Sequence, residues 1–280
     1  MLEPSVESEL AAWLPEWVAS AILFVTVLVY VRGWLRGERD RTRLSAFLAG
    51  IALLAIAIAS PLEALDDSFL SAHMVQHFLL MMAAPPLLLA GHPFVPFLRG
   101  LPRVWVKRGL KPLFASRPLR RVTSWLVAPP AAGILFACAM IFWHIPRFFE
   151  LALASPFWHD IEHATFFWGG ILFWWPIVES RRWPRWVSIP YLLFGDLVNT
   201  AVSAFFVFSG RVLYPSYEAA RTSGISALDD QVLAGLIMWV PGSVVYLVPA
   251  FVITMRVVAG GGRSDPRRIK AWRTGEKGSA

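Results

Sequence analysis

The chain lacks the features of a small secreted, disulfide-rich protein. Its 280 residues include one cysteine, Cys138, so no intramolecular disulfide can form. Cys138 lies within an apolar run, where we expect a small buried hydrophobic side chain. The first residues, MLEPSVESELAAW, are acidic and lack the basic segment of a secretory signal peptide, so we do not expect a cleaved leader. No clear internal repeat is present, so a repeat array is not expected.

What the chain has in abundance is apolar sequence. Hydrophobic residues make up 56% of it, the mean hydropathy is +0.55, and there are 14 Trp and 20 Phe. A membrane-spanning helix needs roughly 20 apolar residues. We therefore predict an all-α, polytopic membrane helix bundle with about seven transmembrane helices. Their approximate ranges are 12–34, 43–60, 67–90, 121–143, 160–178, 187–208 and 232–256.

Basic residues alternate between the predicted loops, and this alternation predicts the topology. The basic segments carry Arg32, Arg36, Arg39, Arg41 and Arg43; Arg99, Arg103, Lys107, Arg108, Lys111, Arg117, Arg120 and Arg121; Arg181, Arg182 and Arg185; and six bases of the tail. Basic loops remain on the cytoplasmic side. We therefore expect the N-terminus outside and the C-terminus inside. The net charge of +7 then reflects topology and anionic lipid, and nucleic-acid binding is not expected.

The charge pattern also divides the chain. Residues 1–259 are predicted to form a single integral-membrane helical domain, and residues 260–280 a basic, disordered cytoplasmic tail. The inner segment from about 91 to 120 mixes bases with Trp105 and Phe114, so we expect an interfacial helix there.

Histidines form the strongest functional signal. Five of the six are predicted at the outer ends of spans: His73, His77, His144, His159 and His163. Two of these sets, His73 with His77 and His159 with His163, are four residues apart and so share a helical face. Asp229, Asp230 and Gln231 are predicted at the same depth, and His92 on the opposite side. Because ionisable residues inside a membrane are costly, this cluster predicts a functional site.

The residue types narrow the ligand to a metal or haem. Neutral imidazole suits copper, zinc and iron, and thioether sulfur favours Cu(I). Methionines near the histidines therefore favour copper, and Cu(I) in particular; they are Met74, Met81, Met140 and Met238. Haem is an alternative, because two facing histidines can supply both axial ligands. In a third interpretation no metal binds, and the histidines form a polar network with Asp229, Asp230 and Glu162.

A hydrolase is the remaining alternative. His159-Asp-Ile-Glu162-His163 matches H-x-x-E-H, in which two histidines bind zinc and the glutamate activates water. Asp229 or Asp230 could supply a third ligand. The pattern is short, and the chain lacks the soluble helical scaffold in which it normally occurs, so we do not expect an enzyme. Asp196 and Asn199 lie near mid-depth of the sixth span, and proton or cation handling and structural hydrogen bonding both remain open for them.

Three segments resemble a known family. They are HMVQHFLLMMAAPPLLLAG, then FWHIPRFFELALASPFWHDIEHATFFWGGILFWWPIVE, and later ALDDQVLAGLIMWVPG. Together they are similar to the CtaG-type, membrane-integral cytochrome c oxidase assembly factors of bacteria, over about residues 10–256. The matching positions are His73, His77, His144, His159, His163, Asp229, Asp230 and Gln231.

The resemblance implies a multi-pass protein of the bacterial inner membrane that serves a haem–copper oxidase, commonly by supplying copper. Its expected partners are oxidase subunits, the lipid bilayer and a periplasmic copper donor. The leading hypothesis is thus an assembly factor that holds copper, Cu(I) above all, at the outer histidine cluster. Alternatives are a haem-binding protein of electron transfer or haem handling, a membrane zinc hydrolase, and a scaffold without metal.

Overall fold

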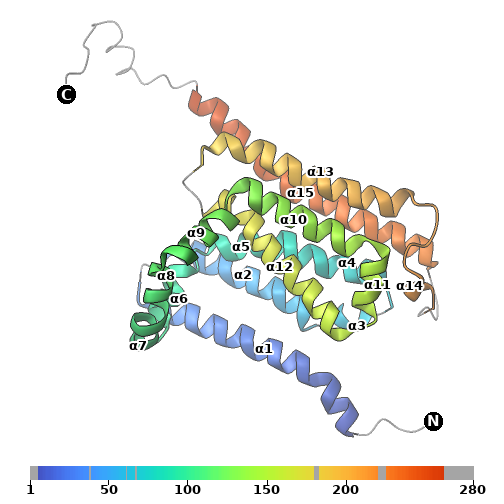
Figure 1. Cartoon of the computed structure of the whole chain (residues 1–280), viewed down its shortest axis with the longest axis horizontal. Coiled ribbons are helices and arrows are strands. Elements are labelled where there is room, and N and C mark those ends of the chain that lie inside the picture. The colour runs from blue at the N-terminus through green and yellow to red at the C-terminus, as the bar shows by residue number, and fades with distance from the viewer. Residues whose placement is uncertain are drawn as a thin grey trace, which may run out of the picture.

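Every regular element in the described part of the chain is a helix (Figure 1). The computed structural model describes residues 6–37, 39–60, 62–66, 68–179, 183–219 and 225–261. The prediction of an all-α chain is confirmed for these residues. Most of the predicted tail, residues 262–280, lies outside them.

Long helices run side by side along the molecule. They are α1 (Val6–Leu35), α2 (Arg41–Ile58), α4 (Leu70–Phe78), which continues through η1 (Leu79–Ala83) into α5 (Ala84–Ala90), α10 (Pro129–His144), α12 (Pro156–Val178), α13 (Ser188–Phe208) and α15 (Ala227–Gly261). Figure 1 shows that α1 and α15 both start at the same end of the bundle. This direction fits an odd number of crossings, while the side of the membrane on which each terminus lies stays a prediction.

Short helices cover the two ends of the bundle (Figure 1). One end carries α3 (Leu62–Asp66), α11 (Pro146–Leu153) and α14 (Pro215–Ala219); we call it the histidine end. The other carries α6 (Phe94–Gly100), α7 (Arg103–Trp105), η2 (Val106–Leu110), α8 (Lys111–Ala115), α9 (Arg117–Leu126) and η3 (Arg185–Val187); we call it the basic end. The helix expected between residues 91 and 120 is therefore present, as several short helices.

Five described helices are long and apolar enough to cross a membrane. They are Trp17–Leu35, Arg41–Ile58, Leu70–Ala90, Arg185–Phe208 and Ala227–Ala259. Helices α9 and α10 add a sixth if they form one span, although they are bent by 67°. Helix α12 matches the remaining predicted span and has 23 residues, but its mean hydropathy is too low for it to be counted with these five. His159, Asp160, Glu162 and His163 in its first turns lower its hydropathy. Seven spans are thus not confirmed.

The surface of the long helices is strongly apolar. Large exposed side chains include Trp17, Phe24, Leu197, Phe208 and Phe251. A helix that is apolar on both its inner and outer faces fits a lipid surrounding. Cys138 illustrates this point: it was expected to be buried, but it is exposed on α10. The expectation was wrong because an apolar run in a membrane helix does not distinguish the buried face from the lipid-facing face.

Two prolines interrupt the α-helical hydrogen bonding of the third predicted span without ending the helix. Pro85 and Pro86 have no N–H for the carbonyls four residues earlier, and the chain passes through the π-helix η1 just before them. Gly170 of α12 packs against this segment. A Cβ atom there would lie 2.6 Å from the carbonyl oxygen of Met81, so only glycine allows this approach. The contact holds α12 next to η1 and α5.

Two hydrophobic clusters hold the bundle together. The larger one joins α4, α10, α12, α13 and α15 and includes stacked rings of Phe173 and Tyr191, 4.6 Å apart. Within it, Asn199 Nδ2 donates to the Met238 carbonyl at 3.0 Å and so links α13 to α15. The smaller cluster joins α1, α2, η1 and α5. Asn199 therefore has a structural partner, and Asp196 is partly buried on the same helix.

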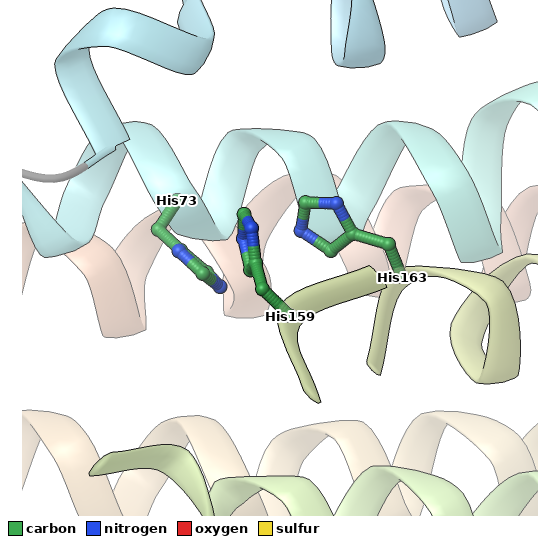
Figure 2. Close-up of side chains that lie close together, drawn as sticks. All are labelled: His73, His159 and His163. Atoms are coloured by element: carbon green, nitrogen blue, oxygen red, sulfur yellow. The ribbon is translucent and has the colours of Figure 1, made fainter. Parts of the chain in front are cut away.

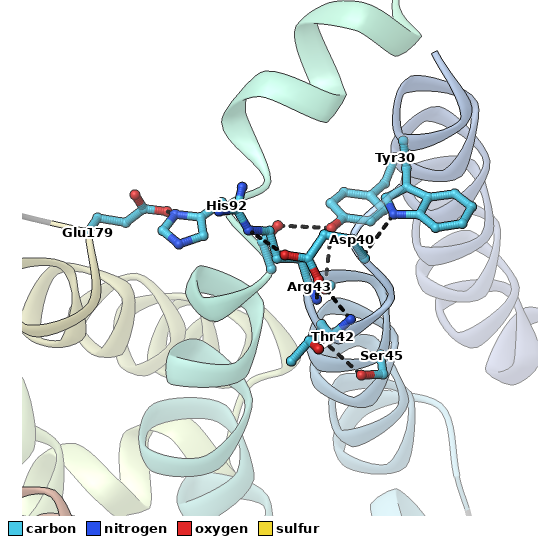
Figure 3. A network of polar contacts seen from close by, with 9 residues as sticks. Tyr30, Asp40, Thr42, Arg43, Ser45, His92 and Glu179 are labelled. Carbon is cyan, nitrogen blue, oxygen red and sulfur yellow. Dashed lines mark hydrogen bonds and ion pairs between the residues drawn. The ribbon is translucent and has the colours of Figure 1, made fainter. Parts of the chain in front are cut away.

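A polar network closes the basic end (Figure 3). Asp40 caps α2 by accepting hydrogen bonds from the N–H groups of Thr42 and Arg43. The hydroxyl of Tyr30 donates to the Gly91 carbonyl at 2.8 Å, which ties α1 to the end of α5. His92 follows α5, and its Nδ1 lies 2.9 Å from Oε1 of Glu179, the residue that follows α12. His92 is therefore separated from the other five histidines by the length of a span.

Candidate metal centre

Helix α4 supplies the most deeply buried pair, His73 and His77. Their four-residue spacing places them on one face, with ring centroids 4.3 Å apart, and both are fully buried. The start of α4 is anchored by Asp230 of α15, which accepts from the Leu70 N–H at 2.8 Å and from Ser71 Oγ at 2.5 Å. A carboxylate at a helix N-terminus satisfies otherwise free N–H groups. Asp230 thus positions the helix that carries the pair.

Helix α12 brings His159 and His163 to face His73 (Figure 2). Pro156 stands at the start of the helix, a position where its missing N–H costs nothing, so His159 falls in the first turn. The ring of His73 lies 5.2 Å from that of His159 and 5.6 Å from that of His163. Both predicted pairs therefore meet at one place, as the sequence indicated.

Glu162 lies between these histidines and is fully buried. Its two carboxylate oxygens are 3.7 Å from Nε2 of His73 and 3.7 Å from Nε2 of His77. We expected Glu162 as a member of a polar network or as the base of a hydrolase, but its position makes it a candidate ligand. The signal was present in the H-x-x-E-H pattern, which places Glu162 on the same broad face of α12 as the two histidines.

Asp66 is a residue that the sequence did not point to. It ends α3, is buried, and its Oδ2 lies 3.8 Å from Nε2 of His159. Its segment, PLEALDD, had been notable only for the absence of basic residues. No spacing rule connects a short helix between spans to the start of a span about 90 residues later, so only the fold could reveal this neighbour.

His144 completes the cluster from the end of α10. Its Nδ1 lies 2.6 Å from the Met140 carbonyl oxygen, so Nδ1 carries the proton and Nε2 has the free lone pair. Its ring is 5.7 Å from that of His77. Tyr214 donates its hydroxyl proton to the His144 carbonyl at 2.8 Å. Burial raises the pKa of Tyr214 well above its usual value, which keeps the hydroxyl protonated and able to donate.

The other residues predicted at this depth have structural partners. Gln231 accepts from the Leu213 N–H at 2.7 Å and donates to Ser209 Oγ at 2.7 Å, so it fixes the segment after α13. Asp229 is exposed and bonded to Ser226. The four methionines that favoured copper, Met74, Met81, Met140 and Met238, are all buried in the larger hydrophobic cluster. Neither carboxylate of Asp229 and Asp230 joins a ligand group among the described residues.

Several buried polar atoms of the cluster have no hydrogen-bond partner within the described residues. They are both ring nitrogens of His73 and His77, Nε2 of His144 and His163, and both carboxylate oxygens of Glu162. Buried polar groups are nearly always satisfied, because leaving them unpaired is costly. A group of donor atoms that the protein itself leaves unpaired therefore fits a bound ion.

The distances agree with this interpretation. Two groups have ligand atoms within 4.8 Å of one another: His73, His159 and His163, and His73, His77 and Glu162. Ligand atoms about 2.1 Å from a tetrahedral ion lie about 3.4 Å apart. The 3.7 Å separations between Glu162 and the two imidazoles need only a small adjustment to reach this value.

The fold and the site define a helical membrane protein with a buried histidine and carboxylate centre at one end of its bundle. Residues 17–259 match the family of cytochrome c oxidase caa3 assembly factors, Caa3_CtaG. The chain therefore belongs to this family, as its motifs indicated.

Curated relatives come from mycobacteria. Uncharacterised proteins of Mycobacterium bovis and Mycobacterium tuberculosis are each 28% identical over 283 residues, and one of Mycobacterium leprae is 26% identical over 288. Each comparison covers 94% of this chain but 41% of the relative. The chain thus spans about two fifths of the length of these relatives. No solved structure matches it significantly.

Proposed function

We propose that this protein holds copper at the histidine cluster and supplies it to a haem–copper oxidase during assembly. The family links the chain to oxidase assembly. The single observation that carries the copper step is the convergence of five imidazoles from three helices, with no hydrogen-bond partner for most of their buried nitrogens among the described residues. In this role the metal is cargo, and the protein is not an enzyme.

The packing of the cluster favours an ion over haem. Neighbouring imidazole rings lie 4.1 to 5.7 Å apart. Axial haem ligands must face each other across the porphyrin plane, and rings this close leave no room for it. Phe149 and Phe166, both buried, pack directly on His73 and His77, at 5.0 and 4.4 Å.

The donor atoms of the site do not distinguish copper from zinc, so our choice of copper rests on the metal that the oxidase contains. Imidazole binds both metals, and a carboxylate alone would favour neither strongly. A haem–copper oxidase contains copper, so an assembly factor that carries metal serves it best with copper. Sulfur adds no further argument, because Met74, Met81, Met140 and Met238 all pack into the hydrophobic core. Cu(I) remains the form we favour, since it tolerates two or three imidazole ligands.

The proposed setting follows from the same topology. The cluster would face the outer side of the bacterial inner membrane, where a periplasmic donor could reach it and where the oxidase subunits could receive the metal. The basic end would face the cytoplasm.

The direct test is the metal content and the optical spectrum of the purified protein. We expect about one copper per chain and no Soret band. The variant His73→Ala/His77→Ala removes one complete ligand pair, so it should lose the copper and the ability to support oxidase activity, with near-normal amounts of protein in the membrane.

The matched control is His92→Ala, which removes a histidine at the other end of the bundle. Copper content should stay unchanged in it. A Soret band in the wild-type protein would favour the haem alternative. Zinc in place of copper, with hydrolytic activity, would favour the hydrolase. Copper and oxidase activity that both persist in the double variant would make the pair structural.

A further inference from the structure

Histidines of the cluster line two separate pockets, and each pocket lies between different helices. A pocket of about 480 Å³ lies between α1, α2 and α12, and His159 and His163 line it. A second pocket, of about 400 Å³, lies between α10 and α13, and His144 is the one polar side chain among the residues that line it. The two pockets share no lining residue. Histidines of the cluster therefore line pockets on two different sides of the bundle.

The histidines form an unbroken series between these pockets. Ring centroids are 4.1 Å apart for His159 and His163, 5.2 Å for His159 and His73, 4.3 Å for His73 and His77, and 5.7 Å for His77 and His144. Each imidazole is thus within reach of the next, and none lies alone. A single Cu(I) position is satisfied by two or three imidazole ligands, whereas five imidazoles are present.

Burial changes along the series. The side chain of His159 is 23% exposed, whereas those of His73, His77 and Glu162 are fully buried. The two possible ligand groups follow this division. The first, His73 with His159 and His163, we call the outer position; the second, His73 with His77 and Glu162, we call the inner position. His73 belongs to both.

We propose that copper occupies these two positions in turn, from the first pocket to the outer position, then to the inner position, and on through His144 to the second pocket. This inference rests on the proposed function. His73 stays bound during the central step: bonds to His77 and Glu162 form as those to His159 and His163 break. The step is a ligand exchange in which Glu162 takes part as the carboxylate, so it needs no electron, and the ion never lacks ligands.

Glu162 gives the inner position a different character from the outer one. It is the carboxylate closest to His73 and His77, and its charge offsets that of the cation in a region without water contact. The inner position should therefore hold the ion more firmly. His144, whose Nε2 carries a free lone pair, is placed to remove it.

The experiment separates the amount of bound copper from its rate of exchange. Purified full-length protein is loaded with Cu(I) and then challenged with bathocuproine disulfonate, whose coloured complex reports release. His159→Ala/His163→Ala should keep most of the final copper content but load at least about tenfold more slowly. His144→Ala should keep the content and slow release. His77→Ala/Glu162→Gln should lose the tightly held fraction, leaving copper that the chelator removes at once.

A triple variant sharpens the test. His144→Ala combined with His159→Ala/His163→Ala leaves the inner position intact and removes both routes, so it should exchange most slowly of all. Equal loss of copper in every variant, with unchanged rates, would mean one shared position and would overturn the relay while leaving copper binding in place. Absence of copper from the wild-type protein would overturn the proposed function itself.

Replacement of buried histidines can disturb folding. Asn variants at positions 159 and 163 retain polarity and one donor, and thermal unfolding of each variant should stay within a few degrees of wild type. If the Ala variants unfold, the Asn variants must show the same separation of rate from content; if they do not, the relay is wrong.

Discussion

Ionisable side chains are mostly buried at one end of the bundle and exposed at the other. At the histidine end, ionisable groups are buried and face one another, and most of the buried nitrogens lack hydrogen bonds within the described residues. At the basic end, a pocket of about 870 Å³ lies between α1 and the segment from α6 to η2. Its basic lining residues are exposed; they are Arg32, Arg36, Arg99, Arg103 and Lys107.

None of these five bases forms an ion pair with a described carboxylate. They need none, because water and lipid headgroups solvate an exposed cation. A buried imidazole or carboxylate has no such option and requires a partner. The comparison teaches that the number of charges at an end says little about binding. The basic end has more charge and is predicted to set the topology, while the histidine end has less charge and is the one for which we propose a bound ion.

The largest expected effect concerns the side of the membrane on which each end of the bundle lies, because labelling from outside should give an all-or-none result. Ser216 of α14 is exposed at the histidine end. In a Cys138→Ser background, Ser216→Cys should react with an impermeant thiol reagent in intact cells, because the basic loops are predicted to lie inside. Labelling only after lysis would reverse the orientation and place the metal centre on the cytoplasmic side.

The packing behind the centre should show the next largest effect. Gly170→Ala adds a Cβ 2.6 Å from the Met81 carbonyl oxygen and should lower stability by roughly 1–3 kcal/mol, the usual cost of overpacking. We expect a lower thermal midpoint and less bound copper, since α12, which carries His159 and His163, would move away from η1 and α5.

Gly169→Ala is its matched control on the same helix. A Cβ at Gly169 would meet nothing within 4 Å. Removing a glycine from a helix interior typically gains about 0.5–1 kcal/mol. Equal destabilisation of both variants would show that α12 does not depend on this close approach.

Glu162→Gln should give an intermediate effect at the centre itself. The substitution keeps the size and one acceptor but removes the charge that lies 3.7 Å from two imidazoles. Loss of a group that supports metal ligands typically costs 10–100-fold in affinity or activity. We expect partial oxidase assembly, measured as oxidase activity in membranes, against near-complete failure for the His73→Ala/His77→Ala variant, which lacks a complete ligand pair. Failure as deep as in the histidine variant, with metal fully bound, would favour a catalytic carboxylate.

The smallest effect is expected at the basic end. His92→Ala removes the contact with Glu179, and His92 is 41% exposed, so the cost should be below about 1 kcal/mol. The backbone φ of 45° at His92 adds slight strain for alanine. Thermal unfolding and copper content measure both consequences. A large loss of copper here would mean that the two ends are coupled.

Much of the site could be predicted from local spacing. The i, i+4 pairs on α4 and α12 fixed which histidines share a face, and hydropathy with loop charge predicted that the pairs lie at one depth. The first inference depends on helix geometry, which is the same in every protein, and the second on hydropathy and loop charge. Composition predicted the helical membrane class, and the three motif-bearing segments indicated the family.

Other features were beyond such reasoning. Cys138 was misjudged because both faces of a membrane helix are apolar, and the seven predicted spans were only partly supported because α12 begins with its polar site residues. Asp230 was expected near the histidines, but its bonds to Leu70 and Ser71 make it an anchor of α4. Each of these depends on how one helix is rotated and placed against another.

The sequence by itself determined the helices, their apolar character, the shared faces of the histidine pairs and the family. These follow from residue spacing and composition, which act over a few turns of chain. Only the tertiary structure decided that Glu162 sits between His73 and His77, that Asp66 reaches His159, and that two pockets approach the cluster through different helices. The reason is physical: these contacts join segments distant in sequence, and their geometry depends on side-chain packing such as that of Gly170 against Met81.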